Sequence, residues 1–184
     1  MLQKIRCQMY LANESTLQGK VEADETYIGG KNKNRHWNKK VKHSQGRSHK
    51  DKTTVVGLIE RGGLLSSLIL DFVQKDSILF TDENSAYNQI GRIYDRYFVD
   101  HGKKQYGNGD ITTNSIEGAW THLKRMVIGT YRNLPKKHLQ KYVDEFVFRY
   151  NLRDISNSDR FNCFLCCADT RYTYKQIKES VCLK

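Results

Sequence analysis

Three acidic residues that are far apart in the sequence have settings suited to one metal site. Asp24 lies in the strand-like segment 20–29, Asp82 ends the apolar run 78–82, and Glu117 lies at the start of a helix-like segment. A carboxylate is costly in a protein core unless it is paired or binds a cation. Two Mg²⁺ ions held by such groups can hydrolyse or transfer phosphodiesters. Together, the three settings predict a metal-dependent site for phosphodiester chemistry.

The first two acids also have ordinary structural interpretations. Asp24 can be a solvent-facing strand residue, and Glu22 and Glu25 are then equal candidates for its role. Asp82 can be a turn or helix-capping aspartate, which is a common use of this residue. Each acid alone is weak evidence, whereas the order of strand acid, strand-end acid, helix acid and lysine is more specific.

The third acid fits two interpretations that are compatible. Asn114 followed by Glu117 is a capping-box pattern, with Asn114 at the cap and Glu117 at the third helical position. Lys124 follows Glu117 by seven residues, which in a helix brings it to within about 20° of the same face. One face would then present a carboxylate to metal and a lysine to phosphate.

The overall charge points to a polyanionic partner. The chain has 184 residues and a net charge of +11, which favours nucleic acid as a partner and is equally typical of a basic structural protein. The length corresponds to about one domain. No apolar run is long enough to span a bilayer, and the first residues lack a signal-peptide core, so we expect an intracellular protein without membrane contact. Cys163, Cys166 and Cys167 resemble half of a zinc site, but no second pair matches.

Much of this charge lies in one segment. Residues 31–52 contain nine Lys or Arg and one Asp, a surplus of eight out of the chain's eleven. Such a segment cannot bury a core and is predicted to be a loop. It can be a solvated loop of no consequence, but Trp37 offers a stacking surface beside the charges, which favours DNA contact. The predicted contacts from this segment are Lys31, Lys33, Arg35, Lys39, Lys40 and Lys42.

Hydrophobic periodicity predicts an α/β domain. We expect a short helix within 1–19, strands at 21–29, 53–60, 78–81 and 94–100, and a helix beginning near Pro135. The apolar run 64–73 is of uncertain type. The last helix has an amphipathic pattern that predicts one core-facing side, formed by Leu139, Tyr142, Val143, Phe146, Val147 and Tyr150.

At these residues the chain resembles the DDE transposases of ISXO2-like (IS1595-type) insertion sequences. The matching segments are Val21-Glu-Ala-Asp-Glu-Thr-Tyr-Ile-Gly-Gly-Lys31, Thr81-Asp-Glu-Asn-Ser-Ala-Tyr87, Thr113-Asn-Ser-Ile-Glu-Gly-Ala-Trp120, Leu123-Lys-Arg125, Gly129-Thr-Tyr131, Lys137-His-Leu139, Tyr142-Val-Asp-Glu-Phe146 and Arg149-Tyr-Asn151. The resemblance implies a ribonuclease H-like mixed sheet flanked by helices and a site with two Mg²⁺ or Mn²⁺ ions. It implies that Asp24, Asp82 and Glu117 are catalytic metal ligands, with Asn114 as a secondary catalytic candidate. It also implies that Lys124 and Arg125 contact DNA.

The resemblance has limits that bear on the fold. We expect 1–19 to be a helical remnant of the N-terminal part that relatives carry, and 20–178 to be the catalytic domain. Only residues 64–77 occupy the place of a third strand and a helix, so one strand is expected to be missing or shortened. The second strand, with Val55, Val56, Leu58 and Ile59, would then be an exposed edge that invites pairing. Thr112 occupies a position where relatives often have histidine.

These patterns predict the catalytic domain of a DNA transposase that cuts and joins strands. Its partners would be transposon ends, target DNA and further copies of the chain, in the cytoplasm or nucleoid of a bacterium or the nucleus of a eukaryote. The alternatives are a truncated DNA-binding remnant without catalysis and, with less support, a cellular ribonuclease H or junction resolvase.

Overall fold

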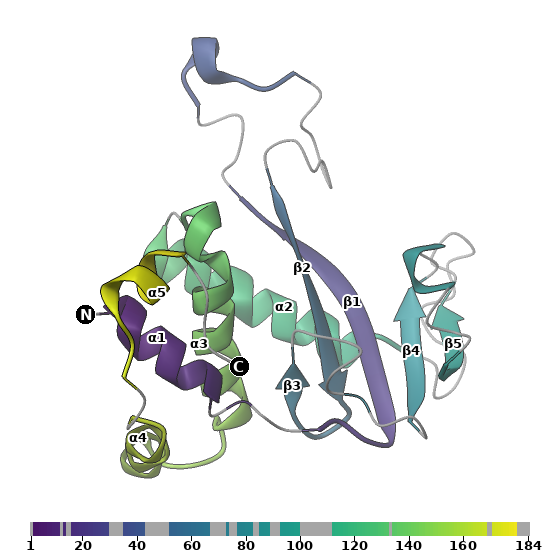
Figure 1. Ribbon diagram of the computed structural model, residues 1–184. Helices are drawn as coiled ribbons and strands as arrows, with labels where there is room; N and C mark the ends of the chain where they lie inside the picture. The colour runs from purple at the N-terminus through teal and green to yellow at the C-terminus, as the bar shows by residue number, and fades with distance from the viewer. Residues whose placement is uncertain are drawn as a thin grey trace.

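A mixed β-sheet forms the centre of the protein in the computed structural model (Figure 1). The structure describes residues 2–11, 13, 16–29, 35–42, 52–66, 73, 77–82, 85–88, 93–99, 112–132, 134–168 and 171–179. The strands are β1 (Lys20–Ile28), β2 (Thr53–Glu60), β3 (Leu65–Ser66), β4 (Ile78–Asp82) and β5 (Asp95–Val99). Their order is β3-β2-β1-β4-β5. Strand β2 runs antiparallel to both β1 and β3, whereas β4 and β5 run parallel to β1. This confirms the predicted α/β class and the ribonuclease H-like mixed sheet.

The two faces of the sheet carry separate cores because strand side chains alternate. Val21 and Ala23 pack with Leu58 and Leu79 on one face. On the other face, Val55 and its neighbours Ile28 and Ile59 pack against the helices. Glu22, Asp24 and Thr26 belong to this second face by strand parity, so the carboxylates of Glu22 and Asp24 lie on the side of the sheet that the helices cover.

The third strand is present, and its described part is Leu65–Ser66. Leu58 pairs with Ser66, and Ile59 pairs with Leu65. A third strand is therefore present, and the predicted open edge is wrong at Leu58 and Ile59, which are paired and buried. Asn151 covers the outer side of β3: its Oδ1 accepts from Leu65 N at 2.8 Å and its Nδ2 donates to Leu65 O at 3.1 Å.

The helices gather on one side of the sheet in Figure 1. They are α1 (Leu2–Leu11), α2 (Asn114–Met126), α3 (Leu139–Asn151), α4 (Asn157–Cys166) and α5 (Tyr174–Glu179). The shorter turns are η2 (Trp37–Lys39), η3 (Ser85–Asn88), the π-helical η6 (Val127–Tyr131) and η7 (Lys136–His138). Among the residues that the structure describes, no helix is long and apolar enough to cross a membrane.

The central helix α3 is buried on two sides. Its predicted apolar face packs in the core through Leu139, Val143, Phe146 and Val147. Its second side was not predicted from the sequence, and Glu145 there accepts from Arg6 of α1 at 2.7 Å. Helix α1, from the segment 1–19 that was expected to be a remnant, thus packs against α3. Pro135 precedes η7 rather than starting α3 directly.

Candidate functional site

The register of β1 and β4 places Asp24 and Asp82 at the same level. Lys20 pairs with Ile78 and Glu22 with Phe80, and the same offset of 58 residues carries Asp24 to Asp82. Carboxylate oxygens of Asp24, Glu25 and Asp82 lie within 4.8 Å of one another. Two Mg–O bonds of about 2.1 Å span roughly 4 Å, so a small side-chain adjustment lets these groups share one ion. The predicted proximity of Asp24 and Asp82 is observed.

The electrostatic setting of Asp24 favours a cation. Burial raises the pKa of its carboxyl to about 6, a hydrogen bond from the backbone of Glu25 opposes this rise, and the charges of Asp82, Glu25 and Glu117 add to it. Desolvation and like charges both disfavour the ionised form, and a bound cation would offset both. A raised pKa at a cluster of acids is a feature of functional sites as well as of buried networks.

Glu25 belongs to this cluster, although strand alternation alone would direct it to the opposite face from Asp24. The hydroxyl of Tyr87, from η3 just after β4, donates to Glu25 Oε2 at 2.7 Å. Burial and this hydrogen bond raise the pKa of Tyr87 above its ordinary value, so the hydroxyl stays protonated as a donor. The sequence contained only two signs that Glu25 belongs to the cluster: its position next to Asp24 and the tyrosine in segment 84–87.

Glu22 has a different role from its neighbours on β1. Its Oε2 accepts from the backbone N–H groups of Ser115 at 2.9 Å and Ile116 at 3.1 Å. Its Oε1 accepts from the Ser115 hydroxyl at 3.1 Å and from Arg61 Nε at 2.8 Å. Glu22 therefore caps the N-terminus of α2 from a neighbouring strand, which removes it as an equal alternative to Asp24.

The capping box predicted at the start of α2 is wrong. Thr113 occupies the N-cap position and its side chain makes no capping hydrogen bond, while Asn114 is the exposed first residue of the helix. The prediction failed because Glu22 already satisfies the amides that a local cap would serve. Thr113 Oγ1 instead donates to Glu117 Oε1 at 3.3 Å. Glu117 is exposed in the first turn, near enough to raise the pKa of Asp24 but outside the 4.8 Å group.

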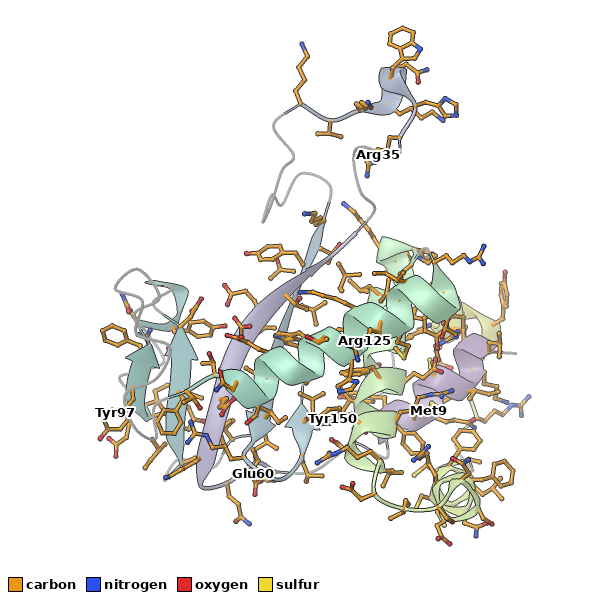
Figure 2. The ribbon with its side chains drawn as sticks, turned by 180° about the vertical axis from the view of Figure 1, so that it is seen from behind. Met9, Arg35, Glu60, Tyr97, Arg125 and Tyr150 are labelled. Atoms are coloured by element: carbon orange, nitrogen blue, oxygen red, sulfur yellow. The ribbon has the colours of Figure 1, made fainter. Side chains whose placement is uncertain are left out.

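The predicted DNA contacts fall into two regions. Lys124 and Arg125 are exposed on α2, where Figure 2 labels Arg125. The second region is the described segment 35–42, called the arm, whose η2 turn lies beyond the ends of β1 and β2 in Figures 1 and 2. Trp37 in this arm is 86% exposed. Its described basic residues are Arg35, Lys39, Lys40 and Lys42, whereas Lys31 and Lys33 lie outside the described residues.

No second group of metal-ligating side chains appears in the described part of the chain. Cys163 and Cys166 are exposed and Cys167 is half-buried, without forming such a group. The half-zinc interpretation therefore gains no support from the structure.

Comparison with known proteins assigns the chain to a family. A 27% identical relative, an "Uncharacterized transposase-like protein" of Haemophilus influenzae, aligns over 105 residues, covering 57% of this chain and 84% of that protein. An "Uncharacterized protein in transposable element ISH50" of Halobacterium salinarum is 26% identical over 155 residues, covering 72% of this chain and 52% of that protein. The chain thus spans about half the length of the Halobacterium protein. No solved structure gives a significant match.

The family profile matches a range that includes the whole sheet and the carboxylates described above. It covers residues 16–151, from just before β1 to the end of α3, and describes the ISXO2-like transposase domain. Because this match extends over most of the chain, the protein belongs to the ISXO2-like transposase domain family.

Proposed function

We propose that this chain is the catalytic domain of a transposase that cuts and joins DNA strands with divalent metal. The observation that carries the proposal is the convergence of Asp24 and Glu25, in the middle of β1, with Asp82 at the end of the adjacent parallel strand β4, together with the pKa of Asp24 raised to about 6. Ligands in open α/β sheets commonly bind beyond the carboxyl ends of strands. The family assignment and the net charge of +11 support DNA as the substrate.

The donor set fits Mg²⁺ or Mn²⁺. Both ions prefer carboxylate oxygens, and the cluster offers only such donors. Asp24 and Asp82 would hold metal directly, and Glu117 would complete the site from α2. When bound, such ions activate the attacking oxygen and stabilise the leaving oxygen. Glu25, held by Tyr87, adds a further carboxylate whose orientation is fixed before metal arrives.

The protein's own residues also supply the contacts to DNA in this proposal. Lys124 and Arg125, exposed on the helix that carries Glu117, would hold backbone phosphates beside the carboxylates. The arm between β1 and β2 would hold a more distant part of the duplex, with Trp37 as a stacking surface. Transposon ends, target DNA and further copies of the chain on DNA are the partners we propose, inside the cell.

Catalysis is tested by cleavage of supercoiled DNA and of terminal-repeat DNA with Mg²⁺ or Mn²⁺. We expect Asp24→Asn to reduce cleavage by about 100-fold or more, since it replaces a charged carboxylate ligand with a neutral amide. Glu60→Gln on β2 makes the same chemical change outside the cluster and should retain cleavage. Equal cleavage by wild type and Asp24→Asn would refute the site. No thermal stabilisation by Mn²⁺, alongside salt-sensitive DNA binding, would instead identify a non-catalytic DNA-binding remnant.

DNA contact by the arm is tested by the salt dependence of binding. Replacing Lys39 and Lys40 with alanine should lower the slope of log K against log salt by about 2, at roughly 0.9 per phosphate contact. The matched control replaces Lys4 and Lys175, which are exposed on α1 and α5. An equal fall in both double variants would show a general charge effect and contradict a specific role of the arm.

A further inference from the structure

We propose that Glu22 and Arg61 are positioning residues that join the start of α2 to β1 and thereby hold Glu117 over the Asp24–Asp82 site. The inference rests on the proposed function, because it assigns a task to residues that support the third carboxylate. Neither residue would touch metal or DNA.

The Glu22 side chain is fully occupied by protein donors. Its exposed fraction is 0%, and both oxygens are engaged by the four donors described above. Two of those donors are the backbone N–H groups of Ser115 and Ile116, which a helix otherwise leaves unsatisfied at its first turn. A carboxylate at this end is also favoured by the helix dipole. Metal binding by Glu22 would require breaking these bonds, so a supporting role fits it better.

Arg61 connects three parts of the structure at this point. Its Nε donates to Glu22 Oε1 at 2.8 Å, and its Nη2 donates to Thr112 O at 2.9 Å in the approach to α2. Its guanidinium lies over the Phe80 ring of β4, 4.4 Å from the centroid. Its backbone N–H donates to Lys20 O of β1 at 3.1 Å. The planar guanidinium serves Glu22, Thr112 and the Phe80 ring at once, which a lysine ammonium cannot do.

These contacts place the helix acid relative to the strand acids. Glu22 and Asp24 are two residues apart on the same face of β1, a separation of about 7 Å along the strand. On the helix, Glu117 directly follows Ile116, whose N–H is bonded to Glu22. A change of one residue in where the helix meets the strand would rotate Glu117 by about 100°. The hydrogen bond between Glu22 and the Ile116 N–H therefore sets both the position of the Glu117 carboxylate along β1 and its rotation about the axis of α2.

The experiment measures Mn²⁺ affinity of the full chain by titration calorimetry. Glu22→Gln keeps the size of the side chain but removes its charge and replaces one acceptor oxygen with a donor group that opposes Arg61. We expect Mn²⁺ affinity to fall by about 10-fold or more, the range found when supporting residues of metal sites are changed. Glu60→Gln, an acid on β2 outside these contacts, should stay within twofold of wild type.

A double-mutant comparison separates positioning from general loosening. If Glu22 acts through Glu117, Glu22→Gln should have no further effect in a Glu117→Gln background, in Mn²⁺ affinity or, where that variant binds too weakly, in cleavage rate. A purely structural role predicts a lower melting temperature with unchanged Mn²⁺ affinity. Should Glu22→Gln fail to fold, Arg61→Lys serves instead, because it keeps the positive charge but removes the planar guanidinium. Arg61→Lys should likewise have no further effect in the Glu117→Gln background.

The outcomes distinguish this inference from the proposed function. Wild-type protein that binds no Mn²⁺, or binds it equally well as Asp24→Asn, overturns both. Mn²⁺ binding that depends on Asp24 but is unchanged by Glu22→Gln overturns the positioning role alone. The same holds if Glu22→Gln weakens binding equally in the wild-type and Glu117→Gln backgrounds.

Discussion

Gly57 offers a sharp test of how α2 is seated on the sheet. It lies on β2 directly opposite Asp24 in the antiparallel register. A Cβ added at Gly57 would lie 2.3 Å from Cη2 and 2.6 Å from Cζ2 of Trp120, which is buried on α2. Trp120 follows Glu117 by three residues, so the indole lies about one turn further along the helix. The absence of a side chain at Gly57 therefore permits the close approach of α2 to the strand beside Asp24.

The expected effect of Gly57→Ala follows from this clash. The indole is a rigid ring enclosed by the core, so either α2 or the strand must move. Overpacking of this kind typically costs about 1–3 kcal/mol, and we expect the upper half of that range. At about 2–4 °C per kcal/mol for a chain of this size, the melting temperature should fall by roughly 4–12 °C. Because α2 carries Glu117, Mn²⁺ affinity should fall as well.

Gly118→Ala is the matched control on the same helix. An added Cβ at Gly118 meets nothing within 4 Å, and the residue is exposed in the helix interior. Replacing glycine by alanine in such a position stabilises a helix by about 0.5–1 kcal/mol, so this variant should melt slightly above wild type. Both variants are compared by thermal circular dichroism without metal. Gly57→Ala melting at the wild-type temperature with an unchanged near-ultraviolet spectrum would refute the proposed packing of Trp120.

Two further predictions concern the buried acid of α3 and the edge of the sheet. Burial raises the pKa of Asp144 to about 7 despite a hydrogen bond from Gln140. The folded state therefore holds this proton more tightly than the unfolded chain, and stability falls as pH rises from about 4 to about 7. Asp144→Asn should melt higher than wild type at pH 8 and equally at pH 4, and no gain at pH 8 would contradict the shift. Asn151→Ala removes both bonds to Leu65, which should cost about 1–3 kcal/mol and promote self-association in gel filtration. A fully stable monomer would argue against edge protection by Asn151.

Local sequence patterns were sufficient to predict the strands and helices, but not the contacts that these elements make on their polar sides. Alternation predicted β1, β-branched residues predicted β2, and helical periodicity predicted the core face of α3 through residues such as Val143 and Phe146. The opposite side of α3 was missed because Asp144 and Glu145 appear in the sequence as an ordinary polar face. Glu145 is buried there by Arg6, which lies 139 residues away. A periodic pattern records one apolar face and contains no information about distant charged partners.

The third strand was misjudged for a related reason. Fourteen residues appeared too few for a strand and a helix, so the strand was expected to be missing or shortened. The length argument could not predict that Leu65 and Ser66 pair with Ile59 and Leu58, or that the amide of Asn151 continues the hydrogen bonding on the outer side. This contact joins positions 86 residues apart. The protection of the edge therefore depends on the docked position of α3 rather than on any property of the strand itself.

The three acids of β1 show what decides a site among equal candidates. Glu22 is completely buried, yet its charge is matched by Arg61 and by the amides of α2. Glu25 is held by the hydroxyl of Tyr87. Asp24 differs, because the influences on its pKa are burial, one hydrogen bond and three negative charges, with no cation among them. Its burial is therefore the least compensated by the protein, so a bound cation would stabilise it most. That difference, which strand alternation cannot reveal, is the physical ground for proposing a metal ligand at Asp24.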